Sequence, residues 1–375
     1  MSRPALLRTA GRTLYFITSQ LRRHGANPFQ RAALPVVEEE IWVGEGRQRA
    51  RSLLYRPAAA GPWPGAAVLD GVSKLGIEDP RLIHFARSTA ACGFVVLTVD
   101  LPDMRRYFLT LHDVKRIVRA FRALRARPEV DPQNLGIVGF CFGASFALLA
   151  AAELGPDEPV GWIGGYGGYY DFGDVIRYGV TGTYPAGQSY RVAPDPYVRK
   201  IYFFNHLHHF GLPPAQEEAL RAVLLHDLRG EPDQLERSAR DLLPAVREVY
   251  RQIVTPFDPA ATSLLERARA EVPNDFIQFN VAPRLPRIQV GRVYLLHARD
   301  DAIIPAPETG RLAQALRGAG IGPVEIHITS LFAHVNPHDQ VRFWRDTVPG
   351  AWGLLRFALA AVRPDSPSPA ERGRG

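Results

Sequence analysis

Cysteine, methionine and lysine are scarce in this chain of 375 residues, which contains two cysteines, two methionines and three lysines. Two cysteines, Cys92 and Cys141, are too few for a disulfide framework or for a zinc site built from thiolates. A pair of thiols outside any such framework is typical of a reducing compartment. We therefore predict a cytoplasmic protein.

Long apolar runs are missing too, and no stretch is long enough to predict a transmembrane helix. Residues 1–30 carry arginines and a short apolar patch, but neither the apolar core nor the cleavage site of a signal peptide. We interpret them as an N-terminal extension whose amphipathic helix packs on the domain. Peripheral contact with a membrane is the alternative, without stable insertion.

Clustered charge of either sign is absent as well. The net charge is +7 and the pI about 9.6, but the basic residues are almost all arginines scattered along the chain. Nucleic-acid binding requires basic residues gathered on one surface or segment, so we expect no nucleic-acid partner. The oligomeric state is left open. With 46% hydrophobic residues, the chain can bury a large core.

The stretch from Leu135 to Leu154 combines a short apolar run, a turn and an apolar helix. Its turn, Gly139-Phe140-Cys141-Phe142-Gly143, has the spacing of a nucleophile elbow with cysteine as the nucleophile. Glycines are needed on both sides because the strand and helix backbones nearly touch. The helix N-terminus favours the thiolate form of Cys141. A packed structural cysteine is the alternative interpretation.

Strand and helix patterns alternate around this turn, which predicts a mostly parallel twisted sheet flanked by helices. The first two strands form an antiparallel pair at the sheet's edge. The predicted strands are 36–43, 49–55, 66–69, 94–99, 135–140, 160–168, 293–298 and 324–329, and the predicted helices are 79–93, 111–127, 142–154, 307–317 and 338–362.

Residues 172–288 interrupt the alternation with aromatic loops and with helices expected at 197–209, 214–228, 234–253 and 260–270. We interpret this segment as a lid over the site. The histidines His206, His208 and His209 do not share one helical face and have no acidic partner close in sequence. We therefore assign them to the surface of the lid and expect no metal site.

An elbow of this kind requires an acid and then a histidine later in the chain. Asp300 and Asp301 follow the strand at 293–298, and His334 follows the strand at 324–329. Together these motifs resemble the α/β-hydrolase superfamily, and within it the dienelactone-hydrolase-like branch that uses a cysteine nucleophile. The resemblance spans a core that we place at residues 31–171 and 289–362, and it does not account for the lid at 172–288 or for the N-terminal extension. The Pro, Ser, Gly and Arg content of residues 363–375 predicts a disordered tail.

The family's acid is the aspartate that precedes two residues and an aliphatic-proline pair. Here that pattern selects Asp301 over Asp300. The family's base, the histidine after the last strand, corresponds to His334. Asp171, at the end of an earlier strand, is an alternative acid. The chain departs from the family in Gly143-Ala144, where two glycines are usual, and in Asp70-Gly71, where many hydrolases have His-Gly.

The resemblance implies that Cys141 attacks an acyl carbonyl while backbone N–H groups of Phe142 and of the Gly71 to Val72 loop bind the oxyanion. Asp70 is either an auxiliary carboxylate near the cysteine or a cap of its loop. The predicted function is hydrolysis of a small carboxylic ester, lactone or thioester through a thioacyl enzyme, without a cofactor. A ligand-binding protein with weak catalysis and an acyltransferase are the alternatives.

Overall fold

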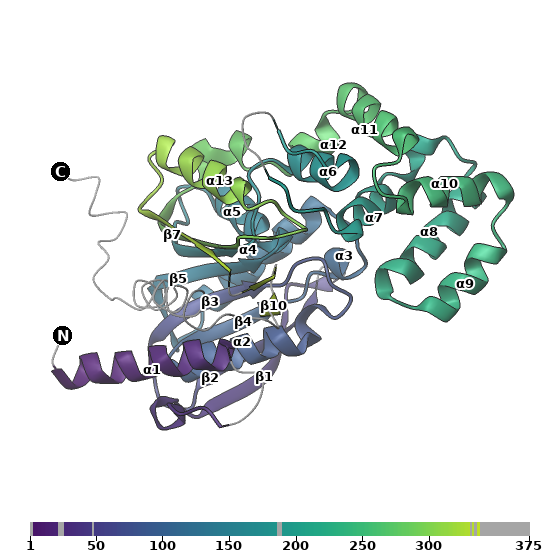
Figure 1. Ribbon diagram of the computed structural model, residues 1–375. Coiled ribbons are helices and arrows are strands. Elements are labelled where there is room, and N and C mark those ends of the chain that lie inside the picture. Colours follow the sequence, from purple (N-terminus) through teal and green to yellow (C-terminus); the bar gives the residue numbers. More distant parts are fainter. Residues whose placement is uncertain are drawn as a thin grey trace.

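The computed structural model describes residues 3–21, 26–46, 49–185, 190–330, 332–333 and 336–337. Its main sheet has eight strands in the order β1-β2-β4-β3-β5-β6-β7-β8 (Figure 1). β2 is antiparallel to both of its neighbours, and every other neighbouring pair is parallel. The strands are β1 (Val36–Val43), β2 (Ala50–Pro57), β3 (Trp63–Leu69), β4 (Val95–Val99), β5 (Val130–Phe140), β6 (Val160–Tyr166), β7 (Val290–Ala298) and β8 (Val324–Thr329).

Helices flank this sheet, and the regular elements described between β6 and β7 are also helices. Those of the core are α1 (Arg3–Leu21), η1 (Gln30–Ala32), η3 (Gly76–Glu78), α2 (Pro80–Ala91), α3 (Pro102–Arg105), α4 (Leu111–Arg125), α5 (Phe142–Leu154) and α13 (Pro307–Gly318). Those between β6 and β7 are α6 (Phe172–Thr181), α7 (Pro196–Asn205), η4 (Leu207–Phe210), α8 (Pro214–Arg229), α9 (Pro232–Arg240), α10 (Pro244–Val254), α11 (Pro259–Glu271), α12 (Asn274–Ile277) and η5 (Ala282–Arg287).

Alternating side chains of the central strands enter two separate hydrophobic clusters, one on each face of the sheet. Ala67 and Leu69 of β3 pack in the cluster that contains α4, α5 and α13. Their neighbours Ala66 and Val68 pack in the other cluster, beneath α2. Both faces of the central strands are therefore covered, as a parallel sheet requires. The predicted mostly parallel sheet flanked by helices, with an antiparallel pair at its edge, is confirmed.

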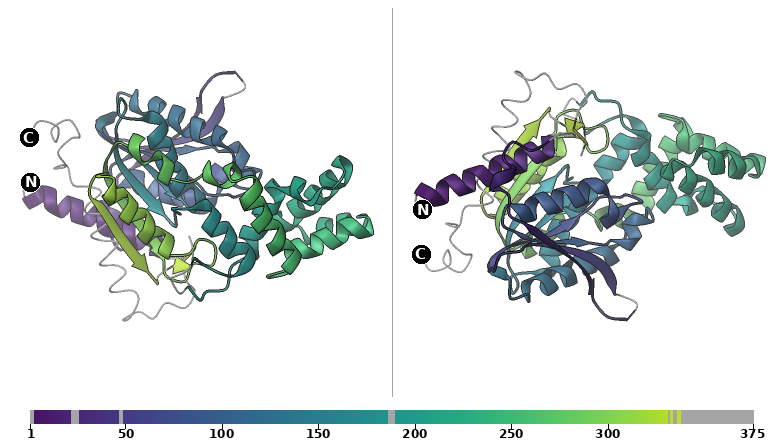
Figure 2. Two further views of the ribbon diagram at one scale, coloured as in Figure 1. Left: turned by 90° about the horizontal axis from the view of Figure 1, so that it is seen from above. Right: turned by 90° about the horizontal axis from the view of Figure 1, so that it is seen from below.

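Helices α6 to α12 form a helical layer that extends from one end of the sheet (Figures 1 and 2). Their buried side chains share one hydrophobic cluster with α4 and α5. The single helix predicted for 234–253 is wrong, because the chain forms α9 and then α10. Pro244 begins the second helix, since proline lacks the N–H that an uninterrupted helix would need there. Helix α6 was not expected from the sequence, and the helix predicted for 197–209 already ends at Asn205.

Helix α1 packs on α2, as predicted for the N-terminal extension. The rings of Phe16 and Phe85 lie edge to face with centroids 5.6 Å apart. Nε2 of His84 lies 2.9 Å from the carbonyl oxygen of Ser19. In the described part of the chain, no helix has both the length and the apolar character needed to cross a bilayer. The predicted helix at 338–362 and the tail at 363–375 lie outside the described residues.

Gly136 of β5 offers a test of how tightly the sheet is packed. A Cβ added there would lie 2.2 Å from the indole of Trp162 on β6, whereas a Cβ at Gly310 of α13 would meet nothing within 4 Å. Overpacking should make Gly136→Ala less stable by about 1–3 kcal/mol. Gly310→Ala should instead gain up to about 1 kcal/mol from helix propensity. Denaturant unfolding of both variants measures this, and equal effects would contradict the packing described for β5.

Candidate active site

Cys141 lies between β5 and α5 in a backbone conformation that side-chain-bearing residues rarely adopt, with φ 54° and ψ −127°. Glycine is required at positions 139 and 143 because neither position has room for a side chain. A Cβ on Gly139 would lie 2.1 Å from the carbonyl oxygen of Gly143, and a Cβ on Gly143 would lie 2.3 Å from that of Asp70. The Cys141 N–H donates to the carbonyl oxygen of Tyr166 at 2.7 Å, which joins the turn to β6. The geometry is that of a nucleophile elbow.

The loop after β3 lies directly against this cysteine. A Cβ on Gly71 would lie 2.8 Å from Cβ and 3.4 Å from Sγ of Cys141. The Gly71 N–H, however, donates to Oδ1 of Asp70 at 2.8 Å and is already engaged. No described residue accepts a hydrogen bond from the Val72 N–H. Phe142 occupies the first helical position of α5, where an N–H has no acceptor within the helix.

Asp70 is held in an environment that disfavours its charged form. Burial raises the pKa of its carboxyl to about 6, opposed in part by the hydrogen bond from the Gly71 N–H. Its second oxygen, Oδ2, is buried and has no hydrogen-bond partner in the part of the chain that the structure describes. Asp70 thus caps its own loop through Oδ1 and still keeps an unsatisfied oxygen beside the elbow.

Tyr197 of α7 connects the helical layer to this loop. Its hydroxyl donates to the carbonyl oxygen of Val72 at 2.5 Å, and its ring lies edge to face with Tyr107 at 6.4 Å. Burial raises the pKa of Tyr197 well above its usual value, so the hydroxyl keeps its proton as a donor. The sequence showed only that the segment is rich in aromatic residues, and nothing local identifies this contact.

Asp301 is fully buried, whereas the neighbouring Asp300 is exposed. Oδ1 of Asp301 accepts hydrogen bonds from the N–H groups of Ile303 at 2.8 Å and Ile304 at 3.0 Å. Its Oδ2 lies 3.1 Å from Nε2 of His297, another fully buried side chain. The turn after β7 therefore fixes the carboxylate in one orientation.

His297, which the sequence analysis did not single out, supports this carboxylate. Its Nε2 lies 2.8 Å from the carbonyl oxygen of Ile304, and its Nδ1 lies 2.6 Å from Oγ1 of Thr309. A carbonyl oxygen only accepts, so Nε2 carries the proton and Nδ1 accepts from the threonine hydroxyl. The imidazole N–H thus faces both Ile304 and Asp301. The sequence feature that could have indicated this role is a histidine within a strand predicted to be buried.

The alternative acid, Asp171, caps a helix. Its Oδ1 accepts from the Asp174 N–H at 3.1 Å at the start of α6, and its Oδ2 accepts from Nδ2 of Asn280 at 3.1 Å. The predicted base, His334, lies outside the described residues. Two short strands, β9 (Phe332–Ala333) and β10 (Asn336–Pro337), pair antiparallel in this part of the chain.

One group of potential metal ligands lies in the helical layer between β6 and β7. The nitrogen and oxygen atoms of His208, His209 and Asp275 lie within 4.8 Å of one another. Burial and the neighbouring histidines lower the pKa of His209 to about 4, and burial also lowers that of His206. Both of these imidazoles are therefore neutral near pH 7.

The turns after β3, β5 and β7 carry the loop at Gly71, Cys141 and Asp301, and they share the carboxyl edge of the parallel strands. Ligand sites of open α/β sheets lie at this edge. The strand order, the buried helix α5 and the strained residue before it define a protein of the α/β-hydrolase fold.

Within this fold, residues 50–169 match the model of the dienelactone hydrolase family. The matched segment contains Gly71, Val72, Cys141 and Phe142, whereas Asp301 and His334 lie beyond it. The match therefore covers the turn at Cys141 and the loop after β3. It does not extend to the proposed acid, Asp301, or to the proposed base, His334.

Two curated relatives show what kind of protein this segment is similar to. The chain is 31% identical over 140 residues to a probable 2-oxo-3-(5-oxofuran-2-ylidene)propanoate lactonase of a Bradyrhizobium species, covering 33% of this chain and 55% of that protein. It is 30% identical over 115 residues to acyl-coenzyme A thioesterase 1 of Mus musculus, covering 30% of this chain and 26% of that protein. The chain thus spans about half of the lactonase and about a quarter of the thioesterase.

Solved structures resemble the whole chain more distantly. A putative dienelactone hydrolase from Klebsiella pneumoniae aligns over 87% of this chain and 99% of its own, with a TM-score of 0.43 and 13% identity. A bacterial brefeldin A esterase aligns over 96% and 85%, with a TM-score of 0.47 and 17% identity. At these values the fold assignment rests on the strand order of the chain itself.

The raised pKa of Asp70 predicts a pH-dependent contribution to stability. Because the folded protein binds this proton more tightly than the unfolded chain does, Asp70 lowers the free energy of unfolding as pH rises from about 4 to about 6. Asp70→Asn should therefore gain stability relative to the parent across that interval and then keep a constant advantage. Urea unfolding at a series of pH values measures the difference, with exposed Asp300→Asn as the control variant. If the free energy of unfolding of Asp70→Asn differed from that of the parent by the same amount at every pH, the pKa of Asp70 would not be raised.

Proposed function

We propose that the protein hydrolyses carboxylic esters, lactones or thioesters of small molecules through a thioacyl intermediate on Cys141. The observation that carries this proposal is the backbone of Cys141, with φ 54° between two glycines that have no room for a Cβ. A conformation of this kind costs about 1–3 kcal/mol and persists mainly where function needs it. A merely packed thiol, such as Cys92, needs no such turn.

In the proposed reaction, Sγ of Cys141 attacks the acyl carbonyl and forms a tetrahedral oxyanion. The Phe142 and Val72 N–H groups are the donors we assign to this oxyanion. Gly71 is a weaker choice, because its N–H already donates to Asp70. The similarity to a probable lactonase and to an acyl-coenzyme A thioesterase supports the substrate class.

We assign the proton transfers to His334. It would take the thiol proton of Cys141 and pass it to the leaving alcohol or thiol as the carbonyl carbon–heteroatom bond breaks. A water molecule would then attack the thioester, losing its proton to His334 and releasing the acid while Cys141 regains a proton. Asp301 would hold the imidazole of His334 in the tautomer that faces the sulfur.

The helical segment 172–288 serves in this proposal as a lid that shapes the acyl pocket. Tyr197 supports that role, because it reaches from α7 to the loop beside Cys141. Its hydroxyl contacts the carbonyl oxygen of Val72, the residue whose N–H is a proposed oxyanion donor.

The nucleophile is tested by comparing the two cysteines. Burial raises the pKa of Cys92 to about 12, and its thiol donates to the Arg12 carbonyl oxygen, so Cys92 should resist iodoacetamide near pH 7. We expect alkylation of Cys141 to remove ester hydrolysis in proportion to labelling. Cys141→Ala should lose turnover by about 10³-fold or more while keeping its fold, and Cys141→Ser should retain measurable activity.

The same assay separates hydrolysis from the alternatives. A thioacyl adduct of Cys141, seen by mass spectrometry during turnover, supports a covalent route. Product that appears only with an added alcohol or thiol acceptor indicates acyl transfer, and ligand binding without any product indicates a binding protein. An alanine variant as fast as the parent on every responsive ester would remove the basis of the proposal.

The acid is tested with adjacent aspartates. Asp301→Asn keeps Oδ1, which accepts from Ile303 and Ile304, but it removes the charge that orients the base. We expect kcat to fall by about 10⁴-fold with KM little changed. Exposed Asp300→Asn should behave like the parent. The acid would be misplaced if Asp300→Asn lost as much, or if only Asp171→Asn reduced kcat.

A further inference from the structure

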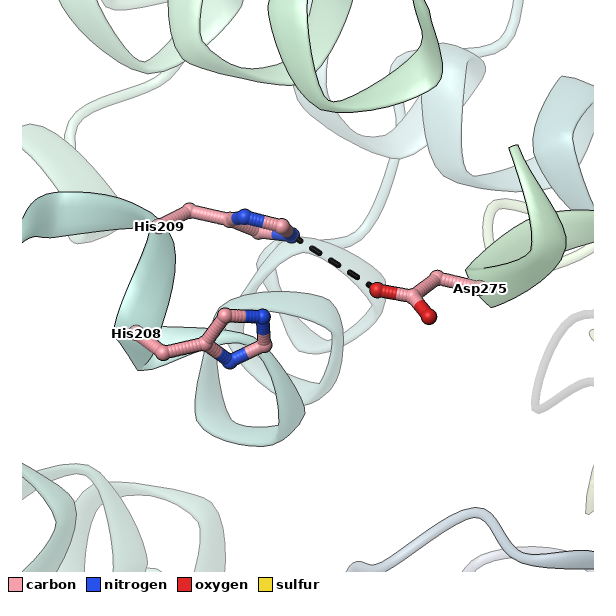
Figure 3. A group of neighbouring side chains, drawn as sticks. All are labelled: His208, His209 and Asp275. Atoms are coloured by element: carbon pink, nitrogen blue, oxygen red, sulfur yellow. Dashed lines mark ion pairs between the residues drawn. The ribbon is translucent and has the colours of Figure 1, made fainter. Parts of the chain in front are cut away.

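Three histidines at the end of α7 and in η4 meet an aspartate that is distant in sequence. His206 follows α7, His208 and His209 lie in η4, and Asp275 lies in α12. Figure 3 shows His209 and the Asp275 carboxylate facing each other, with the His208 ring beside them. The acidic partner that the sequence lacked near the histidines is supplied by the fold.

The distances within this cluster suit a bridging ion better than direct hydrogen bonds. Oδ2 of Asp275 lies 3.8 Å from Nε2 of His206 and 3.9 Å from Nε2 of His209. Hydrogen bonds between such atoms are about 2.7–3.2 Å long. Zinc bonds of about 2.1 Å hold two tetrahedral ligand atoms about 3.4 Å apart. The rings of His206 and His209 lie parallel with centroids 5.6 Å apart, so rotation of one ring would bring both nitrogens to ligand positions.

The histidine nitrogens that face the aspartate are suited to binding a metal. Nδ1 of His206 lies 2.9 Å from the carbonyl oxygen of Tyr202, so Nδ1 carries the proton and Nε2 keeps its lone pair. Histidine ligands of metals commonly have such a backbone carbonyl at the other nitrogen. Nε2 of His209 is buried and has no hydrogen-bond partner among the described residues. The lone pair of His206 and the unpaired nitrogen of His209 thus lie near one carboxylate oxygen.

We propose that this cluster binds one divalent ion of the zinc class. His208, His209 and Asp275, whose ligand atoms lie within 4.8 Å of one another, are three ligands, and His206, whose Nε2 lies 3.8 Å from Oδ2 of Asp275, is the fourth. Mixed imidazole and carboxylate donors suit zinc, whereas calcium and magnesium take mainly oxygen ligands. Four protein ligands leave no open position, so the site is structural and not catalytic.

Such an ion would link α7 to α12 next to the aromatic contacts that lead to the elbow. His206 stacks on Tyr202 at 4.6 Å, and Tyr202 stacks on Phe276 of α12 at 5.7 Å. Phe276 packs on Phe172 at 6.5 Å, and Phe172 packs on Phe142, the residue after Cys141, at 6.1 Å. Metal binding would therefore stabilise the part of the helical layer that contacts the candidate active site.

The test is metal binding by the intact chain of 375 residues, measured without turnover so that it is independent of the proposed hydrolysis. The protein is stripped with a chelator, and Cys141 is alkylated so that its sulfur cannot bind the ion. It is then titrated with Zn²⁺ against a chromophoric chelator, and separately with Co²⁺. We expect one equivalent, a tetrahedral Co²⁺ spectrum without thiolate charge transfer, and a higher Tm in Zn²⁺.

Single variants locate the ion. His209→Gln and Asp275→Asn should each weaken Zn²⁺ binding at least tenfold. His226→Gln should bind like the parent, because this histidine of α8 pairs with Glu231 at 2.8 Å and lies outside the cluster. Circular dichroism verifies that the variants fold. If a variant does not fold, the Co²⁺ spectrum of the parent protein tests the proposal without it.

The proposal is overturned if the thiol-blocked parent shows no saturable binding or gives an octahedral Co²⁺ spectrum. It is also overturned if both cluster variants bind as tightly as the parent, or if His226→Gln loses as much affinity as they do.

Discussion

The close approach of two backbones at Gly139 and Gly143 is the constraint on which the rest of the site depends. No Cβ fits at either position, so β5 can run into the buried helix α5 with a single residue between them. That residue, Cys141, must take a positive φ, which turns its side chain out of the strand-to-helix path. The same contact brings the carbonyl of Asp70 against the helix, and so the loop after β3 is fixed beside the cysteine.

The sequence was informative where the physical cause is local. Glycines two residues either side of Cys141 predicted the turn, because the crowding at Gly139 comes from Gly143, only four residues away. Apolar runs predicted the central strands because both faces of a parallel sheet are buried. The break before Pro244 also had a local cause, since proline cannot continue a helix, and weighting it more heavily would have separated α9 from α10.

Contacts between distant segments were beyond such reasoning. The contact between His297 and Asp301 could not be predicted from the sequence, because it depends on how the turn after β7 folds back on the strand. Asp275 reaches the histidines of η4 only through the packing of α12, and so the absence of a nearby acid in the sequence was not decisive. The direction of the Gly71 N–H, which donates to Asp70, likewise required coordinates.

Through its hydroxyl, Tyr197 connects helix α7 to the loop that carries the Val72 N–H. An acyl group that displaces α7 would therefore also displace a proposed oxyanion donor, although it touches neither the donor nor the sulfur. Discrimination between substrates would then be expressed in the rate of the chemical step as well as in binding.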